Sequence, residues 1–459
     1  MKRLPFSPFV DAAKRNAPAV RDDACNQFLT FGELEDRALT WAGKLKGERG
    51  LVFLLIPNSV DGTACLLGAW MAGHAVALVD PAIQPLAFEA LVAAYVPEFV
   101  VQADSDGQLA VRHEQGGGGP IHPDLFALLS TSGSTGSPKF VRLTQDNLLS
   151  NARAIAEVLD IREGETGCGH LPLHYSYGLS VLTSHLQAAA PVLLTQKGFT
   201  DRDFWPLVRE AGVAHLPGVP FHFQMMQRLR YERLQLPSLR VLTQAGGSLN
   251  VEARAVAHAF MDARGGRFHV MYGQTEASPR MTTLSHDGFR NAPGSVGTAL
   301  PGGRLAITDE AGVELPAGVE GHVRYTGPNV MMGYAEGRAD LASGDTMNGW
   351  LETGDLGFLD EQGQLTLTGR AKRFGKVYGL RVNLDEIERL ANSVCEAAIV
   401  QQGDHVHIYL RDADMEDEML AAMVERYTLP RTAYKLHYVD AIPRTERGKT
   451  DYKALEAML

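Results

Sequence analysis

Short apolar runs alternate with segments of helical periodicity over most of the chain. Leu51–Ile56 is a continuous apolar run typical of a buried strand, Val60–Ala72 then has the spacing of a helix, and His74–Val79 predicts a second strand. A strand, a helix and a further strand in this order predict a parallel sheet covered by helices. The same alternation returns at Val192–Thr195, Val213–Leu216 and Leu239–Thr243.

The pattern changes twice toward the C-terminus. Short strands and Gly/Pro turns follow Pro301. Near Arg370 a basic loop begins, which leads into Leu384–Leu390, two short strands, a helix around Met419–Tyr427 and a final lysine-bearing loop. We therefore expect an α/β protein whose large N-terminal domain, residues 1–369, holds two packed αβ subdomains and a small β-barrel-like subdomain. Residues 370–459 are expected to form a small, mobile α+β domain.

Composition narrows the class of protein. With 459 residues the chain is long enough for about three folding units. Its net charge of −11 disfavours a nucleic-acid partner. The basic N-terminus has no apolar segment of signal-peptide type, and the nearby run Leu51–Pro57 is too short to span a bilayer. We expect no membrane span and a cytoplasmic location, which the four scattered cysteines also favour: Cys25, Cys65, Cys168 and Cys395.

One loop between two predicted strands is rich in glycine and hydroxyl groups. The apolar run Leu125–Leu129 leads into Ser130–Lys139, and Phe140–Leu143 continues as a second strand before a helix that starts after Thr144. Glycine lets backbone N–H groups turn toward an anion, hydroxyls donate to phosphate oxygens, and Lys139 supplies charge. A flexible Ser/Gly linker is the alternative. Since no helix follows the lysine directly, this is not a Walker loop.

This loop resembles the phosphate loop of the adenylate-forming superfamily, which includes acyl-CoA synthetases, aryl-acid ligases, peptide-synthetase adenylation domains and beetle luciferases. The resemblance extends over nearly the whole chain, because further motifs of that family follow in the same order. It implies that the triphosphate of ATP is bound by Thr131, Ser132, Gly133, Ser134, Thr135, Gly136 and Lys139.

A second motif, Met271–Glu276, resembles the family's adenine-binding signature. The resemblance implies that Tyr272 stacks on adenine, that Thr275 contacts the α-phosphate and that Glu276 binds Mg²⁺, a cation that prefers carboxylate oxygen. A strand-end turn with a solvated glutamate is the alternative. Other positions that the resemblance places around the nucleotide are Gly246, Gly247, Gly273 and Gln274.

Three motifs of the C-terminal third complete the series. In Gly349–Asp355 the aspartate, together with Arg370, resembles the ribose-binding pair, although a Gly-Asp turn is the alternative. Lys372 falls at the family's hinge position, and Gly379 lies where a pantetheine arm would pass. Lys449 resembles the catalytic lysine that offsets negative charge on the α-phosphoryl group.

The segment Leu171–Leu179 lies where the family builds the wall of its acid pocket. Tyr175 falls at the aromatic gate position, for which its neighbour His174 also competes. No acidic residue stands between Leu171 and Ala190 to pair with a buried ammonium, which argues against an α-amino acid substrate. We expect an apolar or aromatic acid, bound by His174, Tyr175, Tyr177, Gly178, Phe221, Ala245 and Met271. Plain core packing is the alternative for these side chains.

The resemblance thus implies an enzyme that forms an acyl-AMP from a small carboxylic acid and ATP–Mg²⁺. It then passes the acyl group to a phosphopantetheine thiol, on CoA or on an acyl carrier protein. The acceptor stays open, because the segment between Val400 and Tyr409 is shorter than is usual in the family. The alternatives are a luciferase-like oxygenase of the same fold and a non-catalytic paralogue that serves as a binding module. Lys449 and Glu276 argue against the last.

Overall fold

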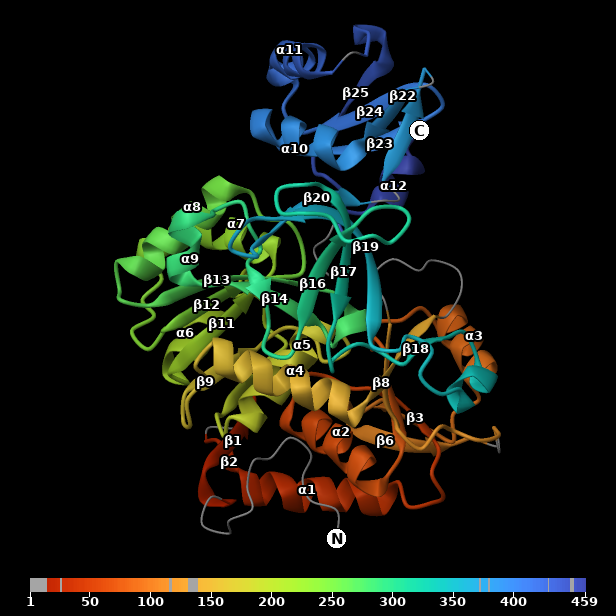
Figure 1. Ribbon diagram of the computed structural model, residues 1–459. Helices are drawn as coiled ribbons and strands as arrows, with labels where there is room; N and C mark the ends of the chain where they lie inside the picture. Colours follow the sequence, from red (N-terminus) through yellow and green to blue (C-terminus); the bar gives the residue numbers. More distant parts are fainter. Residues whose placement is uncertain are drawn as a thin grey trace. The chain divides into compact units, whose positions relative to one another are not determined.

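The computed structural model describes residues 15–24, 27–114, 118–130, 139–370, 373–378, 380–427, 429–445 and 450–459 (Figure 1). The chain divides into two compact units. The first unit comprises Met1–Arg304 and Tyr325–Leu351, and the second comprises Leu305–Arg324 and Glu352–Leu459. The second unit thus takes one short segment from the middle of the chain and the whole C-terminal part. The domain boundary between residues 369 and 370 stays a prediction.

The first unit contains a seven-stranded sheet. Its strands are β3 (Leu51–Leu55), β4 (Ala75–Leu78), β5 (Phe99–Ala103), β6 (Leu109–His113), β7 (Leu125–Ser130), β8 (Phe140–Thr144) and β18 (Gly333–Ala335). They lie in the order β18-β8-β7-β4-β3-β5-β6. The strands β7, β4, β3 and β5 are parallel, whereas β6, β8 and β18 pair antiparallel to their neighbours. The antiparallel pair β7 and β8 flanks the glycine–hydroxyl loop, as expected.

Helices cover both faces of this sheet because its central strands are apolar on both sides. In β3, Val52 and Leu54 belong to one buried cluster and Phe53 to another. The first cluster includes α1 (Phe31–Lys44) and α2 (Val60–Ala72), and the second includes α3 (Pro85–Tyr95). A side chain at Gly68 of α2 would lie 2.5 Å from the carbonyl oxygen of Ala38, so this glycine permits the close packing of α1 and α2.

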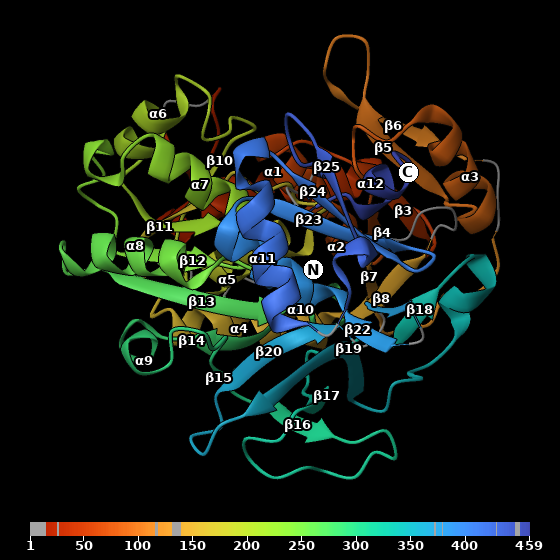
Figure 2. The ribbon, with the colours of Figure 1, turned by 90° about the horizontal axis from the view of Figure 1, so that it is seen from above.

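A nine-stranded sheet also belongs to the first unit. Its strands are β1 (Pro18–Arg21), β2 (Leu29–Thr30), β9 (Thr166–Gly169), β10 (Val192–Leu194), β11 (Val213–Gly218), β12 (Val241–Gln244), β13 (Arg267–Gly273), β14 (Arg280–Leu284) and β15 (Thr298–Ala299). The order is β15-β14-β13-β12-β11-β9-β10-β1-β2, and the strands from β13 to β1 are parallel. The helices that accompany it are α6 (Phe204–Glu210), α7 (Pro220–Arg228), α8 (Val251–Asp262) and α9 (His286–Asn291) (Figure 2).

Two helices lie between the two sheets: α4 (Gln145–Val158) and α5 (Ser176–Gln187). A capping box on Thr144 starts α4 where the sequence predicted a helix. Leu148 of α4 and Leu182 of α5 belong to the cluster shared with the seven-stranded sheet, while Ile155 and Val181 pack with strands of the nine-stranded sheet. Because α5 is buried on both of these sides, its side chains are held in fixed positions.

The second unit is built from three smaller sheets. One has the order β16 (Arg304–Thr308), β17 (Gly321–Thr326), β19 (Trp350–Leu359) and β20 (Leu365–Arg370), and a hairpin joins β21 (Phe374–Val377) to β22 (Leu380–Asn383). The third has the order β23 (Ala397–Gln402), β24 (His405–Leu410) and β25 (Tyr434–Tyr438). The helices α10 (Leu384–Val394) and α11 (Glu416–Arg426) share one buried cluster with this sheet, and α12 (Tyr452–Glu456) contributes to another.

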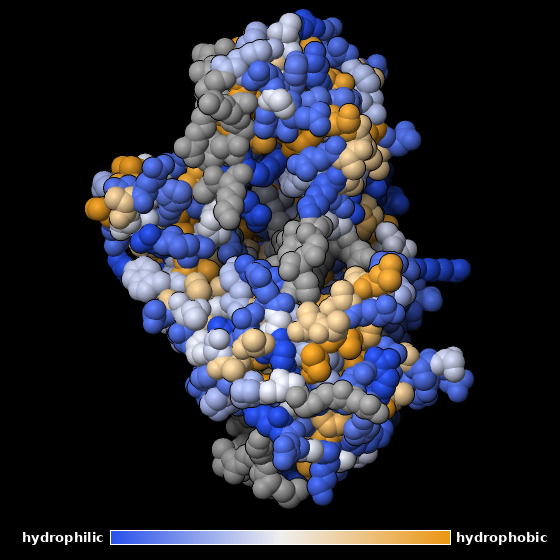
Figure 3. Space-filling model, turned by 90° about the vertical axis from the view of Figure 1, so that its right-hand side faces the viewer, coloured by the Kyte–Doolittle hydropathy of each residue, from blue (hydrophilic) through white to orange (hydrophobic). Residues whose placement is uncertain are grey.

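The structure confirms the α/β class and the elements predicted from periodicity, including α2 with unchanged bounds. The Gly-Asp turn considered at Asp355 is wrong, because this residue lies within the ten-residue strand β19. The third strand β25 was not predicted, and barrel-like closure of the β16–β20 sheet stays a prediction. In the described part of the chain no helix is long and apolar enough to cross a membrane. The face drawn in Figure 3 is mainly hydrophilic, with apolar residues in small groups.

Candidate active site

The second sequence motif begins at the carboxyl end of β13. Parallel sheets bind ligands at this edge, because the loops that follow the strands are free to vary there. Tyr272 and Gly273 end the strand, and Thr275 and Glu276 follow in a short 3₁₀ helix. A side chain at Gly273 would lie 1.8 Å from the carbonyl oxygen of Pro279, so only glycine lets the chain fold back into β14 here. The tight turn fixes the directions of Thr275 and Glu276.

Glu276 and Lys139 meet at a tyrosine that the sequence analysis missed. The hydroxyl of Tyr334 donates to Oε1 of Glu276 at 2.9 Å, and Nζ of Lys139 lies 3.5 Å from the centre of the Tyr334 ring. Burial, with the carboxylate of Glu276 as a lesser cause, raises the pKa of the Tyr334 hydroxyl, so it remains a donor. Tyr334 lies on β18, opposite Val141 of β8, which places it beside the end of the glycine–hydroxyl loop. No sequence spacing reveals this contact, because it joins three distant segments.

Thr275 is joined to the predicted wall of the acid pocket. Its Oγ1 lies 3.0 Å from Oγ of Ser176, the first residue of α5, and both side chains are buried. Tyr175 immediately precedes Ser176, and the Tyr177 hydroxyl lies 2.9 Å from Oγ1 of Thr243 on β12. The start of α5 is therefore attached to both β12 and the turn after β13.

The apolar residues predicted for the acid pocket come together in space. They belong to a single cluster between α4, α5 and the nine-stranded sheet, in which Phe221 is partly buried and the others are buried: Tyr175, Tyr177, Phe221, Ala245 and Met271. The Tyr175 hydroxyl would lie 2.4 Å from a side chain at Gly246, whose φ is +82°. Gly246 is thus required both by its backbone conformation and by the approach of Tyr175. Beside it, a side chain at Gly247 would lie 3.1 Å from Cγ of Pro220.

The two other residues predicted for this pocket have different surroundings. Nε2 of His174 lies 3.3 Å from Oδ2 of Asp80, which follows the strand β4. Tyr175, and not His174, is therefore the side chain that reaches Gly246. A side chain at Gly178 would lie 2.2 Å from the carbonyl oxygen of Pro172, so this glycine allows the preceding turn to pack on α5.

A buried arginine, also missed by the sequence analysis, lies against the same cluster. Arg280 is the first residue of β14 and is 3% exposed. Its Nη1 donates to Sδ of Met271 at 3.1 Å, and its guanidinium lies 4.7 Å from the centre of the Tyr177 ring. Burial lowers the pKa of Arg280. An arginine beside a run of apolar positions carries no sequence signal that distinguishes it from a surface residue.

Three buried histidines lie on α5 and on strands of the nine-stranded sheet, near Arg280. The ring of His185, on α5, lies 5.2 Å from that of His215 on β11, and His269 lies on β13. Burial, with the charges of neighbouring groups including Arg280, lowers the pKa of His185 and that of His269 to about 3 each. These imidazoles are therefore neutral near pH 7.

In the second unit, the predicted ribose-binding residues form a pair. Nε of Arg370 lies 3.2 Å from Oδ1 of Asp355, and the two residues are cross-strand partners on β20 and β19. The carboxylate is buried and the arginine side chain is largely exposed. Other predicted site residues lie outside the described part of the chain: Thr131, Ser132, Gly133, Ser134, Thr135, Gly136, Lys372, Gly379 and Lys449.

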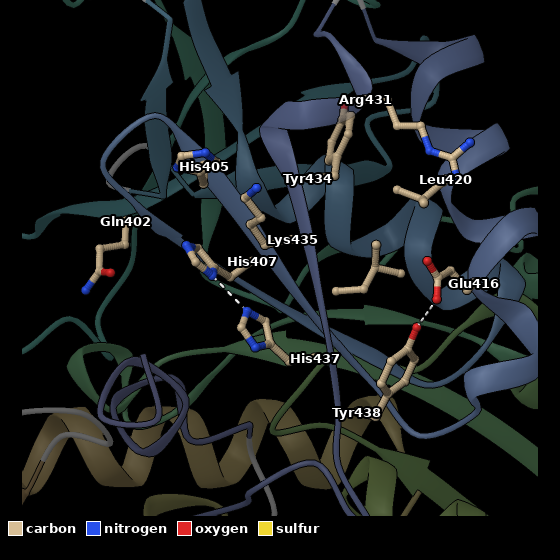
Figure 4. Close-up of a pocket in the computed structure, with 11 residues that line it drawn as sticks. Gln402, His405, His407, Glu416, Leu420, Arg431, Tyr434, Lys435, His437 and Tyr438 are labelled. Carbon is tan, nitrogen blue, oxygen red and sulfur yellow. Dashed lines mark hydrogen bonds between the residues drawn. The ribbon is translucent and has the colours of Figure 1, made fainter.

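A cavity of about 650 Å³ lies on the second unit, along β24 and β25 (Figure 4). It is lined by His405, His407 and His437, among other residues, and Nδ1 of His407 lies 2.8 Å from Nε2 of His437. Burial, and for His407 also the charge of its neighbours, lowers the pKa of both imidazoles. None of the predicted site residues lines this cavity, so we do not assign the reaction to it.

Comparison with known proteins identifies the family. The model of the AMP-binding enzyme family matches residues 9–335. The chain belongs to the AMP-binding enzymes. It is 26% identical to 4-coumarate–CoA ligase 5 of Oryza sativa subsp. japonica over 98% of this chain and 93% of that ligase. It is 31% identical to indoleacetate–CoA ligase of Aromatoleum aromaticum over 72% of this chain and 66% of that protein.

The fold of these AMP-binding enzymes agrees with the architecture described above. The chain resembles the ATP-bound crystal structure of MatB from Rhodopseudomonas palustris with a TM-score of 0.82. Identity is 25%, and the match covers 98% of this chain and 97% of that one. The superfamily resemblance found from the motifs is thereby confirmed, together with ATP-dependent activation of an acid as the chemistry of the family.

Proposed function

We propose that this AMP-binding enzyme is an ATP-dependent carboxylic acid–CoA ligase that works in the cytoplasm. The observation that carries the proposal is a continuous series of side chains from the phosphate-loop lysine to the acid pocket. Lys139 lies over Tyr334, Tyr334 donates to Glu276, and the adjacent Thr275 contacts Ser176 at the start of α5. A nucleotide triphosphate and an acyl group bound along this series would have their reacting ends at Thr275.

In the first half-reaction, a carboxylate oxygen of the acid attacks the α-phosphorus of ATP, and pyrophosphate leaves. Lys139 and the residues of the glycine–hydroxyl loop would neutralise the phosphates, and Tyr272 would stack on adenine. The partly exposed carboxylate of Glu276 fits a ligand for the Mg²⁺ that arrives with ATP, because one of its oxygens is not used by Tyr334. Asp355 and Arg370 are proposed to bind the ribose, and Lys449 to offset the charge on the α-phosphoryl oxygens.

In the second half-reaction, the sulfur of a phosphopantetheine thiol attacks the acyl carbon. The thiol loses its proton and AMP leaves with the bond electrons. CoA is the proposed acceptor, since the relatives compared above are named as CoA ligases. The phosphopantetheine thiol of an acyl carrier protein is the alternative acceptor. Residues 370–459 are proposed to turn about Lys372 between the two half-reactions and to admit the pantetheine arm past Gly379.

The acid is proposed to have an apolar or aromatic body. Tyr175, Tyr177 and Met271 form a suitable surface within one buried cluster. An α-amino acid is disfavoured, because the neighbouring cation is Arg280 and the first turns of α5 carry no carboxylate. The named relatives act on different aromatic acids, so family membership alone does not choose the acid.

The test is pyrophosphate release from ATP–Mg²⁺ with a panel of carboxylic acids, followed by assay of the thioester with CoA and with holo acyl carrier protein. We expect acid-dependent pyrophosphate release and a thioester with CoA. Oxygen uptake or light from the adenylate would favour the luciferase-like alternative. ATP binding without pyrophosphate release for any acid would indicate the non-catalytic paralogue and would refute the proposal.

A further inference from the structure

Among the described residues, the guanidinium of the buried Arg280 has neither an anionic partner nor a carbonyl acceptor. Its side chain is in the interior, at 3% exposure, and among the described residues no carboxylate lies within ion-pair distance of the guanidinium. Its Nε has no hydrogen-bond acceptor within the part of the chain that the structure describes. A buried charge without a partner is strongly unfavourable, so such a group is normally paired or is used to bind a ligand.

The contacts that Arg280 does make are weak. A thioether sulfur is a poor acceptor, and a tyrosine ring offers only its π face. The nearby imidazoles of His185 and His269 are neutral and supply no negative charge. The strong contacts are on the backbone, where Asn151 bonds to both the N–H and the carbonyl of Arg280. The backbone is therefore structurally fixed, while the guanidinium remains available to a ligand.

The two side chains that touch the guanidinium, Met271 and Tyr177, are residues of the proposed acid pocket. Tyr177 follows Ser176, whose hydroxyl contacts Thr275 at the proposed reacting end. Arg280 therefore contacts the residue that follows Ser176 and, through Met271, the strand β13 that leads to Thr275. Met271 is unbranched and flexible, so its sulfur can yield its place to an oxygen acceptor.

We propose that Arg280 binds a second anionic group on the acyl substrate, so that the preferred acid carries two carboxylates joined by an apolar or aromatic spacer. The inference rests on the proposed function, whose pocket it refines. One carboxylate reacts with ATP at Thr275, and the other forms a bidentate pair with the guanidinium in place of the Met271 sulfur. The spacer packs against Tyr175 and Tyr177.

The test compares acids of equal length that carry one or two carboxylates: hexanoate with adipate, octanoate with suberate, and 4-methylbenzoate with terephthalate. The measured quantity is the ratio of kcat/KM for pyrophosphate release, dicarboxylate over monocarboxylate. This ratio does not depend on the fraction of active enzyme. We expect the parent to favour the dicarboxylate at least tenfold for one spacer, and Arg280→Met to lower that ratio roughly 100-fold. Arg280→Lys, which keeps the charge, should fall between them.

Arg254→Met is the matched control. Arg254 is also buried, but its Nη1 donates to the carbonyl oxygens of Ser295 and Pro293, at 3.0 and 3.4 Å, away from the acid pocket. Its removal should change stability and leave the ratio as in the parent. A parent that prefers the monocarboxylate in every pair, or an unchanged ratio in Arg280→Met, overturns the inference while the ligase function stands.

Ligand-induced thermal stabilisation separates the two proposals when no acid releases pyrophosphate. The proposed function then fails, and the inference is judged on binding alone. It holds if a dicarboxylate raises the Tm of the parent but not that of Arg280→Met. It falls if the two proteins respond equally.

Discussion

At the scale of single residues, Tyr334 connects the proposed magnesium ligand Glu276 to the phosphate-loop lysine Lys139. Its hydroxyl is bonded to the carboxylate of Glu276, and its ring lies under the ammonium of Lys139. One side chain therefore orients both a proposed magnesium ligand and a proposed phosphate ligand. Since the tyrosine stays protonated, it shares the carboxylate of Glu276 without removing its charge.

Glu276→Gln should raise the Mg²⁺ concentration needed for half-maximal pyrophosphate release and lower the maximal rate. A hard cation loses a charged oxygen ligand and keeps a neutral one. Tyr334→Phe is the control, because it retains the carboxylate and the ring and removes only the hydroxyl donor. It should leave the Mg²⁺ requirement unchanged or lower it. Superimposable Mg²⁺ titrations of Glu276→Gln and the parent would show that Glu276 is not the ligand.

At the scale of elements, α5 is the helix on which the site depends. Its first turn carries Ser176 and Tyr177, and its tenth residue is His185, whose ring packs on that of His215 on β11. The helix is buried between two sheets, so its polar side chains are removed from water. Burial keeps the imidazole of His185 neutral, and this has a consequence for stability in acid.

The first unit should lose stability as the pH falls below about 6.5. An unfolded histidine binds a proton near its ordinary pKa of about 6.5. In the folded state, burial, followed by the charge of His215, lowers the pKa of His185 to about 3. Between these two pKa values the unfolded state binds more protons than the folded state. Each buried histidine of this kind therefore lowers the unfolding free energy by about 1.4 kcal/mol for every unit by which the pH falls. Denaturant unfolding between pH 5.0 and 6.5 measures this slope.

In this experiment His185→Gln should reduce the slope of unfolding free energy against pH by the contribution of about one bound proton, roughly 1.4 kcal/mol per pH unit, because glutamine does not titrate. His113→Gln is the control, since His113 is exposed on β6. The window lies above the ordinary pKa of about 4 for Asp and Glu side chains. Among them, Glu165 titrates far below it: burial raises its pKa, but hydrogen bonds from His215 and Arg240 prevail and lower it to about 2. Equal slopes in the parent and His185→Gln would contradict the assignment of this imidazole.

At the scale of the whole molecule, the two compact units carry different parts of the proposed chemistry. The first unit holds Glu276, Thr275 and the acid pocket, and the second holds Asp355 and the C-terminal segment with Lys449. Because different residues are proposed to serve adenylation and thioester formation, single substitutions should impair one half-reaction and spare the other.

Lys449→Ala should abolish pyrophosphate release, with a loss of roughly 100-fold or more, while it spares transfer from supplied acyl-AMP to CoA. The lysine is proposed to serve the first half-reaction alone. Gly379→Leu should do the opposite, because an isobutyl group would fill the passage proposed for the pantetheine arm. Each half-reaction is assayed separately. Equal loss of both in either variant would mean that the substitution unfolds the protein or that the roles are misassigned.

The helices, the strands and the order of the motifs could be predicted from the amino-acid sequence. Apolar runs and helical spacing are local properties, so β3, α2 and β4 could be predicted within a residue or two. The glycines of the motifs were also visible, since a turn such as that at Gly273 tolerates no side chain. From these signals came the superfamily resemblance, which the family comparison confirmed.

Which side chains contact one another depends on the three-dimensional fold. Tyr334 reaches Glu276 across 58 positions, and Ser176 reaches Thr275 across 99. Such pairs depend on the sheet order, which places β18 beside β8 and α5 under β13, and no local pattern encodes that order. The burial of Arg280 was likewise invisible, because an arginine's environment is set by the layers that close over it. Periodicity thus predicted the elements, while packing chose the partners of the polar groups inside them.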